Sequence, residues 1–327
     1  MKPTDLRGIL QYIPRFRKKT FVIAADGAVV SHTNFANLLL DIAVLCSLNI
    51  RVVLVHGAAE QISELAAEQS LEPSNLDGTG VTDDTTLKLA LTAANGLTHE
   101  ILEGFAANDL RAANANALTA QPLGVLNGID HENTGQVEHV DIELLQTLLS
   151  RGITPVIPPL GFDGEGNTFR LNSDSVAQCV AKSLQATKLI FISTDDGLHS
   201  EGKFIRQILS TELHNLLTNH PDQIPLGQQS KAQHASEACE SGIPRVHLIN
   251  GLVTEGLLAE VFSNEGIGTL IYANEYRQIR AAEKKADLRE EVPAKAKSKK
   301  KAKAKAESEA ESGAESASGA ESETSSE

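Results

Sequence analysis

The sequence predicts an α/β protein built on a mostly parallel, covered sheet. Short apolar runs alternate with segments whose apolar side chains recur at helical spacing, and this alternation is typical of βαβ units. Short apolar strands separated by helices indicate a sheet with helices on both faces. The predicted strands are Thr20–Ala24, Arg51–Val55, Thr154–Ile157, Lys188–Ser193, Arg245–Ile249 and Gly268–Tyr272. The predicted helices are Asn34–Leu48, Glu60–Ser70, Asp141–Ser150, Asp174–Gln185, Gln228–Ser241 and Thr254–Phe262.

The segment Leu123–Val140 departs from this alternation. It is rich in Gly, Asn and Asp, with short β-like pieces between them, and it predicts a hairpin region. Ligands of parallel sheets bind at the carboxyl ends of the strands. The candidate positions for a site are therefore the turns that follow Ala24, Val55, Ile157 and Ser193.

Composition excludes several classes of function. The chain has 327 residues and is 41% hydrophobic, enough for one large α/β domain or two lobes. A net charge of -14 and an aromatic content of 4%, with no Trp, argue against a nucleic-acid partner. No apolar run reaches the roughly 18 residues that span a membrane, and the first residues lack the apolar segment of a secretory signal. We therefore expect no membrane partner and a cytoplasmic location.

Three cysteines, Cys46, Cys179 and Cys239, lie far apart in the chain. An odd number without a C-x-x-C pair is a poor disulfide framework. We interpret them as small core side chains in a reducing compartment, in preference to a catalytic or metal-binding role. The sequence predicts no metal site.

From residue 283 to residue 327 the sequence is low in complexity. A Lys/Ala block is followed by a Ser/Glu/Ala/Gly block with almost no apolar side chains, so we expect this tail to be disordered. The basic block could contact nucleic acid or the acidic tail, but a solvated linker and tail is the interpretation that we favour.

Three motifs resemble the amino-acid kinase family. IAADG at 23–27 resembles the family's Lys-x-Gly-Gly loop, LVHGAA at 54–59 its His-Gly-Gly-Gly loop, and RLNSDSVA at 170–177 its Asn-x-Asp segment. The resemblance implies a carbamate kinase-like three-layer sandwich with a mostly parallel central sheet. It divides the chain into an N-terminal helix (1–19), a kinase-like domain (20–282) and the charged tail (283–327).

Longer segments, among them FANLLLDIAVLCSLNIRVVLVHGA, GQVEHVD and SGIPRVHLINGLVTEGLLAEVFSNEGIGTLI, resemble the bacterial N-acetylglutamate synthase (amino-acid N-acetyltransferase) family. The resemblance covers most of residues 6–276. In that family an acetyltransferase domain follows, whereas here the charged tail follows. The resemblance therefore implies a role in arginine biosynthesis, with acetyl-CoA bound only through a separate acetyltransferase chain.

The residues that would bind phosphate depart from the kinase pattern. Ala24 stands where the kinases carry the lysine of the first loop, and Asp26 replaces the first glycine of that loop. Loss of one such donor typically costs about 10²–10³ in rate, so we expect neither phosphoryl transfer nor ATP as a cofactor. Asp174 and Lys231 remain at family phosphate positions. Each has a plainer interpretation, Asp174 as a carboxylate at a helix N-terminus and Lys231 as a solvated helix residue.

The acetylglutamate pocket is also reduced. Gly80 stands where the acetylglutamate kinases carry an arginine that binds the substrate carboxylate. Gly57, Ala58 and Asn172 could still line a smaller pocket. N-acetyl-L-glutamate is therefore a second candidate ligand.

The candidate regulatory ligand is L-arginine. The N-terminal stretch of residues 5–23 resembles the extra helix of arginine-sensitive relatives, in which that helix builds a hexameric ring, although an ordinary docking helix fits equally well. The resemblance also implies an arginine site, in which carboxylates bind a guanidinium, glycines allow a tight turn and a lysine binds the ligand carboxylate. Its residues are Lys203, His247, Glu260, Glu265, Gly266, Gly268 and Thr269. The plainer interpretation makes Glu260 a surface carboxylate and His247 a core histidine.

Three functions follow from these observations. The first is an arginine-binding regulatory domain of the N-acetylglutamate synthase family, forming a homo-oligomer that is a dimer or a hexameric ring. The second is an acetylglutamate kinase with an unusual cleft, which Ala24 argues against. The third is a non-enzymatic assembly protein.

Overall fold

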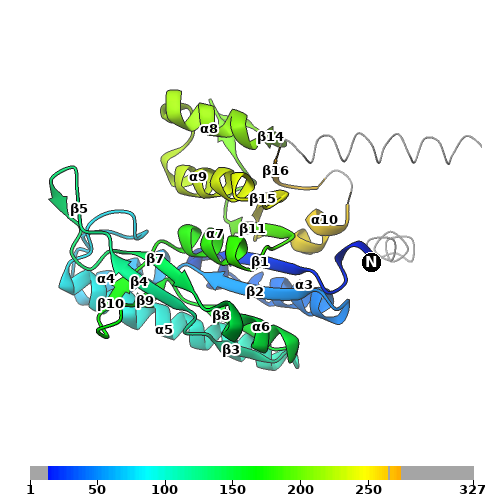
Figure 1. Ribbon diagram of the computed structural model, residues 1–327, viewed down its shortest axis with the longest axis horizontal. Helices are drawn as coiled ribbons and strands as arrows, with labels where there is room; N and C mark the ends of the chain where they lie inside the picture. The colour runs from blue at the N-terminus through cyan, green and yellow to red at the C-terminus, as the bar shows by residue number, and fades with distance from the viewer. Residues whose placement is uncertain (1–13, 264–265, 274–327) are drawn as a thin grey trace, which may run out of the picture. The chain divides into compact units, whose positions relative to one another are not determined.

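The computed structural model describes residues 14–263 and 266–273, which lie in one compact unit. Its central sheet has eight strands in the order β14-β16-β15-β11-β1-β2-β8-β3 (Figure 1). The strands are β1 (Thr20–Ala25), β2 (Arg51–His56), β3 (Ala112–Asn114), β8 (Thr154–Ile157), β11 (Lys188–Ser193), β14 (Gln207–Leu209), β15 (Arg245–Asn250) and β16 (Thr269–Tyr272). All neighbours pair in parallel except β15 and β16, which are antiparallel. The predicted mostly parallel sheet is confirmed.

Alternate residues of β1 explain why helices cover both faces. Phe21 and Ile23 face one core, which α3, α4, α5 and α10 complete, whereas Val22 and Ala24 face a second core, which α6, α7, α8 and α9 complete. Successive side chains of a strand point to opposite faces of the sheet, and helices cover both faces here. Both sets of side chains are therefore buried, which explains why the strand is apolar. The helices are α2 (Gly27–Val30), α3 (Phe35–Ser47), α4 (Ala59–Gln69), α5 (Asp84–Ala107), α6 (Ile142–Ser150), α7 (Ser173–Ser183), α8 (Ser210–Asn219), α9 (Leu226–Glu240) and α10 (Gly256–Phe262).

The chain segment between α5 and α7 forms a second sheet of four strands. Its order is β10-β9-β4-β7, from β4 (Leu118–Pro122), β7 (Gly135–Val140), β9 (Leu160–Phe162) and β10 (Thr168–Arg170). Within the predicted hairpin region, β5 (Val125–Leu126) pairs with β6 (Ile129–Asp130) around Asn127-Gly128. Both loop residues have positive φ, 52° and 81°, which favours Asn-Gly in a two-residue hairpin turn.

Every predicted strand and helix listed above is present, with ends that agree to within two residues. The helix α5, which has 24 residues, was not predicted from the sequence. Asp83 caps its N-terminus by accepting a hydrogen bond from the N–H of Thr86. A stripe of small and branched side chains packs α5 against the first core, and its many alanines and threonines gave only a weak helical pattern.

The three cysteines pack against the two cores as predicted, and the part of the chain that the structure describes contains no disulfide. No helix within residues 14–263 and 266–273 is long and apolar enough to cross a bilayer.

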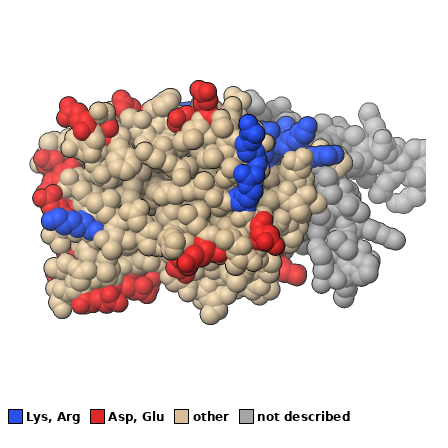
Figure 2. Space-filling model, turned by 90° about the horizontal axis from the view of Figure 1, so that it is seen from below, with Lys and Arg blue, Asp and Glu red and all other residues tan. Residues whose placement is uncertain are grey.

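Figure 2 shows acidic side chains scattered along the margins of one face, not gathered into one patch. The predicted N-terminal helix lies mostly outside the described residues, and the predicted tail lies entirely outside them.

Candidate functional site

A cavity of about 200 Å³ lies at the carboxyl ends of the central strands. The turns that follow β1, β2 and β8 contribute Asp26, Gly57 and Pro159 to its lining. These are three of the four turns that were predicted as positions for a site. The turn after Ser193 is not among the lining segments. Other lining residues come from α4, α7, α9, β10 and the loop before α5.

Lys231 of α9 bridges Asp26 and Asp174, two of the acidic residues that line this cavity. Its Nζ lies 2.8 Å from Oδ1 of Asp26 and 3.3 Å from Oδ1 of Asp174, and its side chain is only 13% exposed. Asp174 also accepts a hydrogen bond from the Ser230 hydroxyl at 2.8 Å. Lys231 is thus not the solvated helix residue of the plainer interpretation, and Asp174 does more than stabilise the N-terminus of α7.

Charge explains this arrangement. Burial lowers the pKa of Lys231, but Asp174 and Asp26 outweigh it and raise that pKa above its ordinary value. Burial raises the pKa of Asp26, Lys231 opposes this and Asp174 adds to it. With all three groups ionised, the cluster carries one net negative charge. A phosphate approaching Lys231 would have to compete with two carboxylates that already neutralise it.

The other residues of the phosphate motifs serve the fold. Ala24 is buried in the second core beside Val22, and Ala58 is buried in the first core although it also lines the cavity. His56 is fully buried, with Nε2 2.8 Å from the Thr98 hydroxyl, and burial lowers its pKa to about 4. It is therefore neutral at physiological pH and supplies no cation to an anionic ligand.

The residues predicted for a reduced acetylglutamate pocket do meet at the cavity. Asn172 is the N-cap of α7: its Oδ1 accepts from the N–H of Ser175, and its Nδ2 donates to the carbonyl of Asp77. Gly57 faces Ser173, because a Cβ at residue 57 would lie 3.2 Å from the Ser173 hydroxyl. Gly57, Ala58 and Asn172 all line the cavity, whereas Gly80 lies behind it against Asn75.

Sequence analysis missed Arg170, the last residue of β10. It lines the cavity and is only 3% exposed. Its Nη1 donates to the Asn75 carbonyl at 2.5 Å and its Nη2 donates to the Leu76 carbonyl. The motif RLNSDSVA contained this arginine, but only the fold shows that its guanidinium reaches the loop 75–77 that closes the cavity wall.

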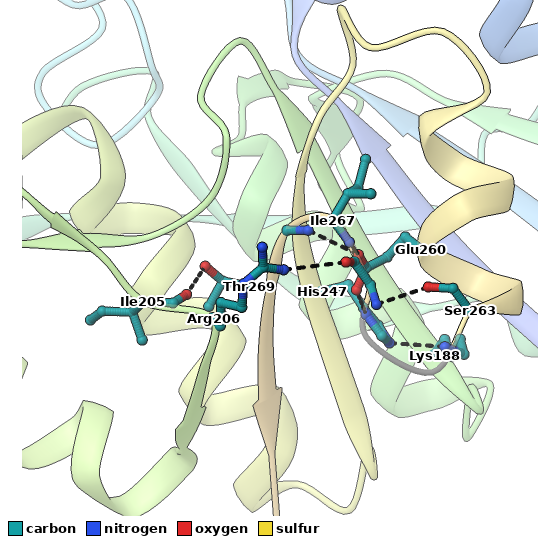
Figure 3. Close-up of polar contacts among 10 residues, drawn as sticks. Lys188, Ile205, Arg206, His247, Glu260, Ser263, Ile267 and Thr269 are labelled. Carbon is teal, nitrogen blue, oxygen red and sulfur yellow. Dashed lines mark hydrogen bonds and ion pairs between the residues drawn. The ribbon is translucent and has the colours of Figure 1, made fainter.

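Several residues of the predicted arginine site, among them His247, Glu260 and Thr269, lie where α10 meets β15 and β16, and none of these three lines the cavity (Figure 3). Glu260 is 4% exposed, so it is not a surface carboxylate. Its Oε1 lies 2.5 Å from Nδ1 of His247, and its Oε2 accepts the N–H groups of Ile267 at 2.6 Å and Gly268 at 3.0 Å. Both oxygens are therefore directed into the protein and organise the loop before β16.

A lysine that the sequence analysis did not single out completes this cluster. Nζ of Lys188, on β11, lies 2.9 Å from Nε2 of His247 and 5.4 Å from the ring centre of Phe16. Burial, the neighbouring Lys188 and Arg245 lower the pKa of His247 to about 4, although Glu260 opposes them, so the imidazole is neutral. It then donates from Nδ1 to Glu260 and accepts at Nε2 from Lys188.

Glu260 carries the negative charge of the cluster. Burial raises its pKa, but the hydrogen bonds from His247, Gly268 and Ile267 outweigh burial and hold the pKa at about 2. Burial lowers the pKa of Lys188 to about 7, with Arg245 adding to this and Glu260 opposing it. The cluster is therefore a buried acid and a buried base separated by a neutral imidazole.

Two of the remaining predicted residues, Gly266 and Thr269, lie in the loop before β16 and at the start of β16. Gly266 has φ 65°, a conformation that favours glycine, and its N–H donates to the Ser263 hydroxyl at 2.8 Å. The Thr269 hydroxyl donates to the Ile205 carbonyl and accepts from the N–H of Leu198. Lys203 lies exposed in the hairpin of β12 (His199–Ser200) and β13 (Lys203–Phe204), and Glu265 lies outside the described residues.

Comparisons with known proteins identify the family of this chain. The model of the amino acid kinase family matches residues 19–250. This chain belongs to the amino acid kinase family. Among curated members, the amino-acid acetyltransferase of *Actinobacillus pleuropneumoniae* serotype 7 is 35% identical over 297 residues, which cover 86% of this chain and 67% of that protein. The amino-acid acetyltransferase of *Pseudomonas fluorescens* Pf-5 is 34% identical over 298 residues, and the chain spans 66% of its length.

Solved structures of other proteins share the fold of this chain. N-acetylglutamate synthase from *Neisseria gonorrhoeae*, solved with coenzyme A and N-acetyl-glutamate, matches with a TM-score of 0.76 and 32% identity. The match covers 82% of this chain and 63% of that protein. The same enzyme has been solved with coenzyme A and L-arginine. Carbamate kinase from *Giardia lamblia*, at 14% identity and a TM-score of 0.57, shares the fold alone. The predicted resemblance to the N-acetylglutamate synthase family and the predicted three-layer fold are confirmed.

Proposed function

We propose that this chain is an arginine-binding regulatory domain of N-acetylglutamate synthesis in the cytoplasm, and that it transfers no phosphoryl group. The observation that carries this proposal is the pairing of Lys231 with Asp26 and Asp174. The cation that a kinase would turn toward a phosphate is held by two carboxylates. Ala24 supplies no second cation, and His56 is neutral.

Arginine binding draws support from the loop before β16. Glu260 stays ionised at physiological pH because its pKa is about 2, and Gly266 and Gly268 let the backbone approach it closely. The guanidinium of a bound arginine would donate to Glu260, either beside the N–H groups of residues 267 and 268 or in their place. It would give Glu260 a charged donor, which forms a stronger hydrogen bond than a neutral one. The relative from *Neisseria gonorrhoeae* solved with L-arginine makes arginine the first ligand to test.

Calorimetry on the full chain tests this function. We expect saturable heat with L-arginine, and no turnover when ATP, Mg²⁺ and N-acetyl-L-glutamate are supplied together in a coupled assay for ADP. Lys203→Met removes an exposed cation from the hairpin of β12 and β13 and leaves the buried cores intact, so it should weaken arginine binding by about 3- to 10-fold if Lys203 binds the ligand carboxylate. Lys182→Met, at another exposed lysine, is the matched control and should leave the affinity unchanged.

The second candidate is an acetylglutamate kinase, favoured only by the presence of Asp174 and Lys231 in a cavity at the strand ends. ADP release that depends on N-acetyl-L-glutamate would establish it and would overturn the first proposal. For the regulatory domain, we propose a homo-oligomer and a separate acetyltransferase chain that binds acetyl-CoA. Sedimentation with and without arginine tests the first of these, and co-purification with acetyltransferase activity tests the second.

A further inference from the structure

Asparagine followed by glycine occurs at three places in the chain, Asn95-Gly96, Asn127-Gly128 and Asn250-Gly251. Glycine has no Cβ, so its backbone nitrogen can approach the side-chain carbonyl carbon of the preceding residue with little hindrance. That approach closes a five-membered ring and releases the side-chain amide as ammonia. Because the backbone between the two residues must rotate first, the structure around each pair decides whether the ring can form.

The pair Asn95-Gly96 is held by the helix that contains it. It lies inside α5, which has 24 residues, and Nδ2 of Asn95 donates to the Leu91 carbonyl at 2.8 Å. The ring can close only if the backbone of Asn95 leaves its helical angles, which breaks hydrogen bonds of the helix on both sides. Although both residues are exposed, this pair is therefore kept in an unreactive geometry.

The pair Asn250-Gly251, at the end of β15, is held by three hydrogen bonds. Nδ2 of Asn250 donates to Oδ1 of Asp196 at 2.7 Å, and Oδ1 of Asn250 accepts from the N–H of Leu252 at 2.8 Å. The N–H of Gly251, which is buried, donates to the Ser193 carbonyl at 2.8 Å. Both the attacking nitrogen and the side chain that it would attack are thus already engaged.

The pair Asn127-Gly128 lacks such restraints. It forms the loop between β5 and β6, in a hairpin that projects from the body of the domain (Figure 1). Both residues are exposed, and a Cβ at Gly128 would meet no atom within 4 Å. Among the described residues, the side chain of Asn127 has no hydrogen-bond partner.

The hairpin turn must open briefly before the ring can close, because it holds Asn127 and Gly128 at φ angles of 52° and 81°. This opening costs little. The strands β5 and β6 contain two residues each and pair only with one another. A hairpin of that size is marginal by itself, and such segments open locally far more often than the core.

We propose that Asn127 is a site of spontaneous covalent modification, with water as the only co-reactant. The backbone nitrogen of Gly128 loses its proton and bonds to Cγ of Asn127, the bond from Cγ to the side-chain nitrogen breaks, and ammonia leaves with the proton. Water then opens the cyclic imide. Attack of water at Cγ gives aspartate, and attack at the backbone carbonyl carbon gives isoaspartate, in which the main chain continues through Cβ.

Either product adds a negative charge to an apolar hairpin. Val125, Leu126 and Ile129 are 65%, 45% and 55% exposed, so the charge appears among apolar side chains that face solvent. Aspartate retains the turn, because Asp-Gly favours the same two-residue loop as Asn-Gly. Isoaspartate adds one atom to the main chain within the loop and disrupts the pairing of Leu126 with Ile129. The inference is independent of the proposed arginine binding.

Incubation of the full chain at pH 8, followed by digestion and mass spectrometry, tests the site. Replacement of NH₂ by OH gives a small mass gain that is assigned to one peptide. The same measurement on the chain unfolded in guanidinium chloride gives the reference rate of each pair, and the ratio of the unfolded to the folded rate is the protection of that pair. We expect protection at residue 127 to be at least about 10-fold smaller than at residues 95 and 250.

Two variants identify the chemistry. Asn127→Gln should abolish the mass gain at residue 127, because glutamine would need a six-membered ring, and it should leave residues 95 and 250 unchanged. The peptide of Asn127→Asp is the chromatographic standard for the aspartate product. The modified wild-type chain should yield this peptide and a second peptide of equal mass that separates from it, which is the isoaspartate form.

Two results would overturn the proposal. The first is protection at residue 127 that is less than about 10-fold smaller than at either of the other two pairs. The second is a modified wild-type peptide that contains the aspartate form alone, because direct hydrolysis of the side-chain amide gives aspartate without a cyclic intermediate.

Discussion

Replacing Glu260 by glutamine tests the buried cluster at the proposed arginine site. The substitution keeps the size of the side chain and removes its charge. The amide oxygen, placed where Oε2 lies, can still accept the hydrogen bonds from Ile267 and Gly268, but the bond from His247 is lost. The NH₂ group then faces the Nδ1–H donor of His247, and Lys188 loses the acid that balances its charge.

The magnitude follows from the pKa of Glu260. The ordinary pKa of a glutamate is 4.5 and the pKa of Glu260 in the folded protein is about 2, a difference that corresponds to about 3 kcal/mol of stability. Because the folded pKa is depressed, this contribution is fully present above pH 4.5 and is lost as the pH falls toward 2. We therefore expect Glu260→Gln to lower the free energy of unfolding by about 3 kcal/mol at pH 7, and the difference from wild type to shrink below pH 4.5.

Urea unfolding at pH 7 and at pH 3.5, monitored by circular dichroism, measures this difference. Glu103→Gln is the matched control, because Glu103 pairs with His99 on the surface, where the two side chains are 70% and 75% exposed. The control should lie within about 0.5 kcal/mol of wild type. A loss below about 1 kcal/mol for Glu260→Gln at pH 7 would show that the cluster does not hold the carboxylate as described.

Four further substitutions have expected outcomes in the same assay. Lys231→Met leaves two carboxylates facing each other and should cost about 3 kcal/mol, with a smaller loss at pH 3.5, where carboxylates protonate. Burial raises the pKa of Asp41 to about 6, so ionised Asp41 opposes folding above that pH, and Asp41→Asn should stabilise the protein at pH 8 but not at pH 3.5. Gly268→Ala places a Cβ 2.1 Å from the Leu248 carbonyl and should cost several kcal/mol, whereas Gly96→Ala, with no atom within 4 Å, should stabilise α5 by about 0.5–1 kcal/mol. A stable Gly268→Ala protein would contradict the close approach of β15 and the loop before β16.

Much of the fold was predictable from the sequence because the strands of the central sheet are buried on both faces. The segment Lys188–Ser193, for example, is continuously apolar from Leu189 to Ile192, and glycine or proline follows several of the strands. The helix α5 escaped prediction, since its buried face is rich in alanine and threonine and lacks a strong apolar period. Local pattern therefore identified the sheet better than the helix that covers it.

The sequence identified several residues of the candidate sites but not the contacts between their side chains. The motifs placed Asp174 and Lys231 together through their resemblance to the family, yet only the fold shows that one lysine bridges Asp26 and Asp174. Lys188 and Arg170 gave no signal, because each is a single charged residue in or at the end of a short strand. Lys188 contacts His247, which lies 59 residues away in the chain, and Arg170 contacts Asn75, which lies 95 residues away. Local residue spacing does not predict contacts over such distances along the chain.

The position of β1 has a consequence for how the chain folds during synthesis. Among the strands of the described residues it comes first in the chain, yet it lies in the interior of the sheet between β2 and β11. Its edge toward β11 stays open until residues 188–193 emerge from the ribosome, while β2 can pair with it early. Long-range parallel pairing of this kind is slow and exposes an unpaired edge. A nascent chain of this protein should therefore depend on chaperones until its second half has been translated.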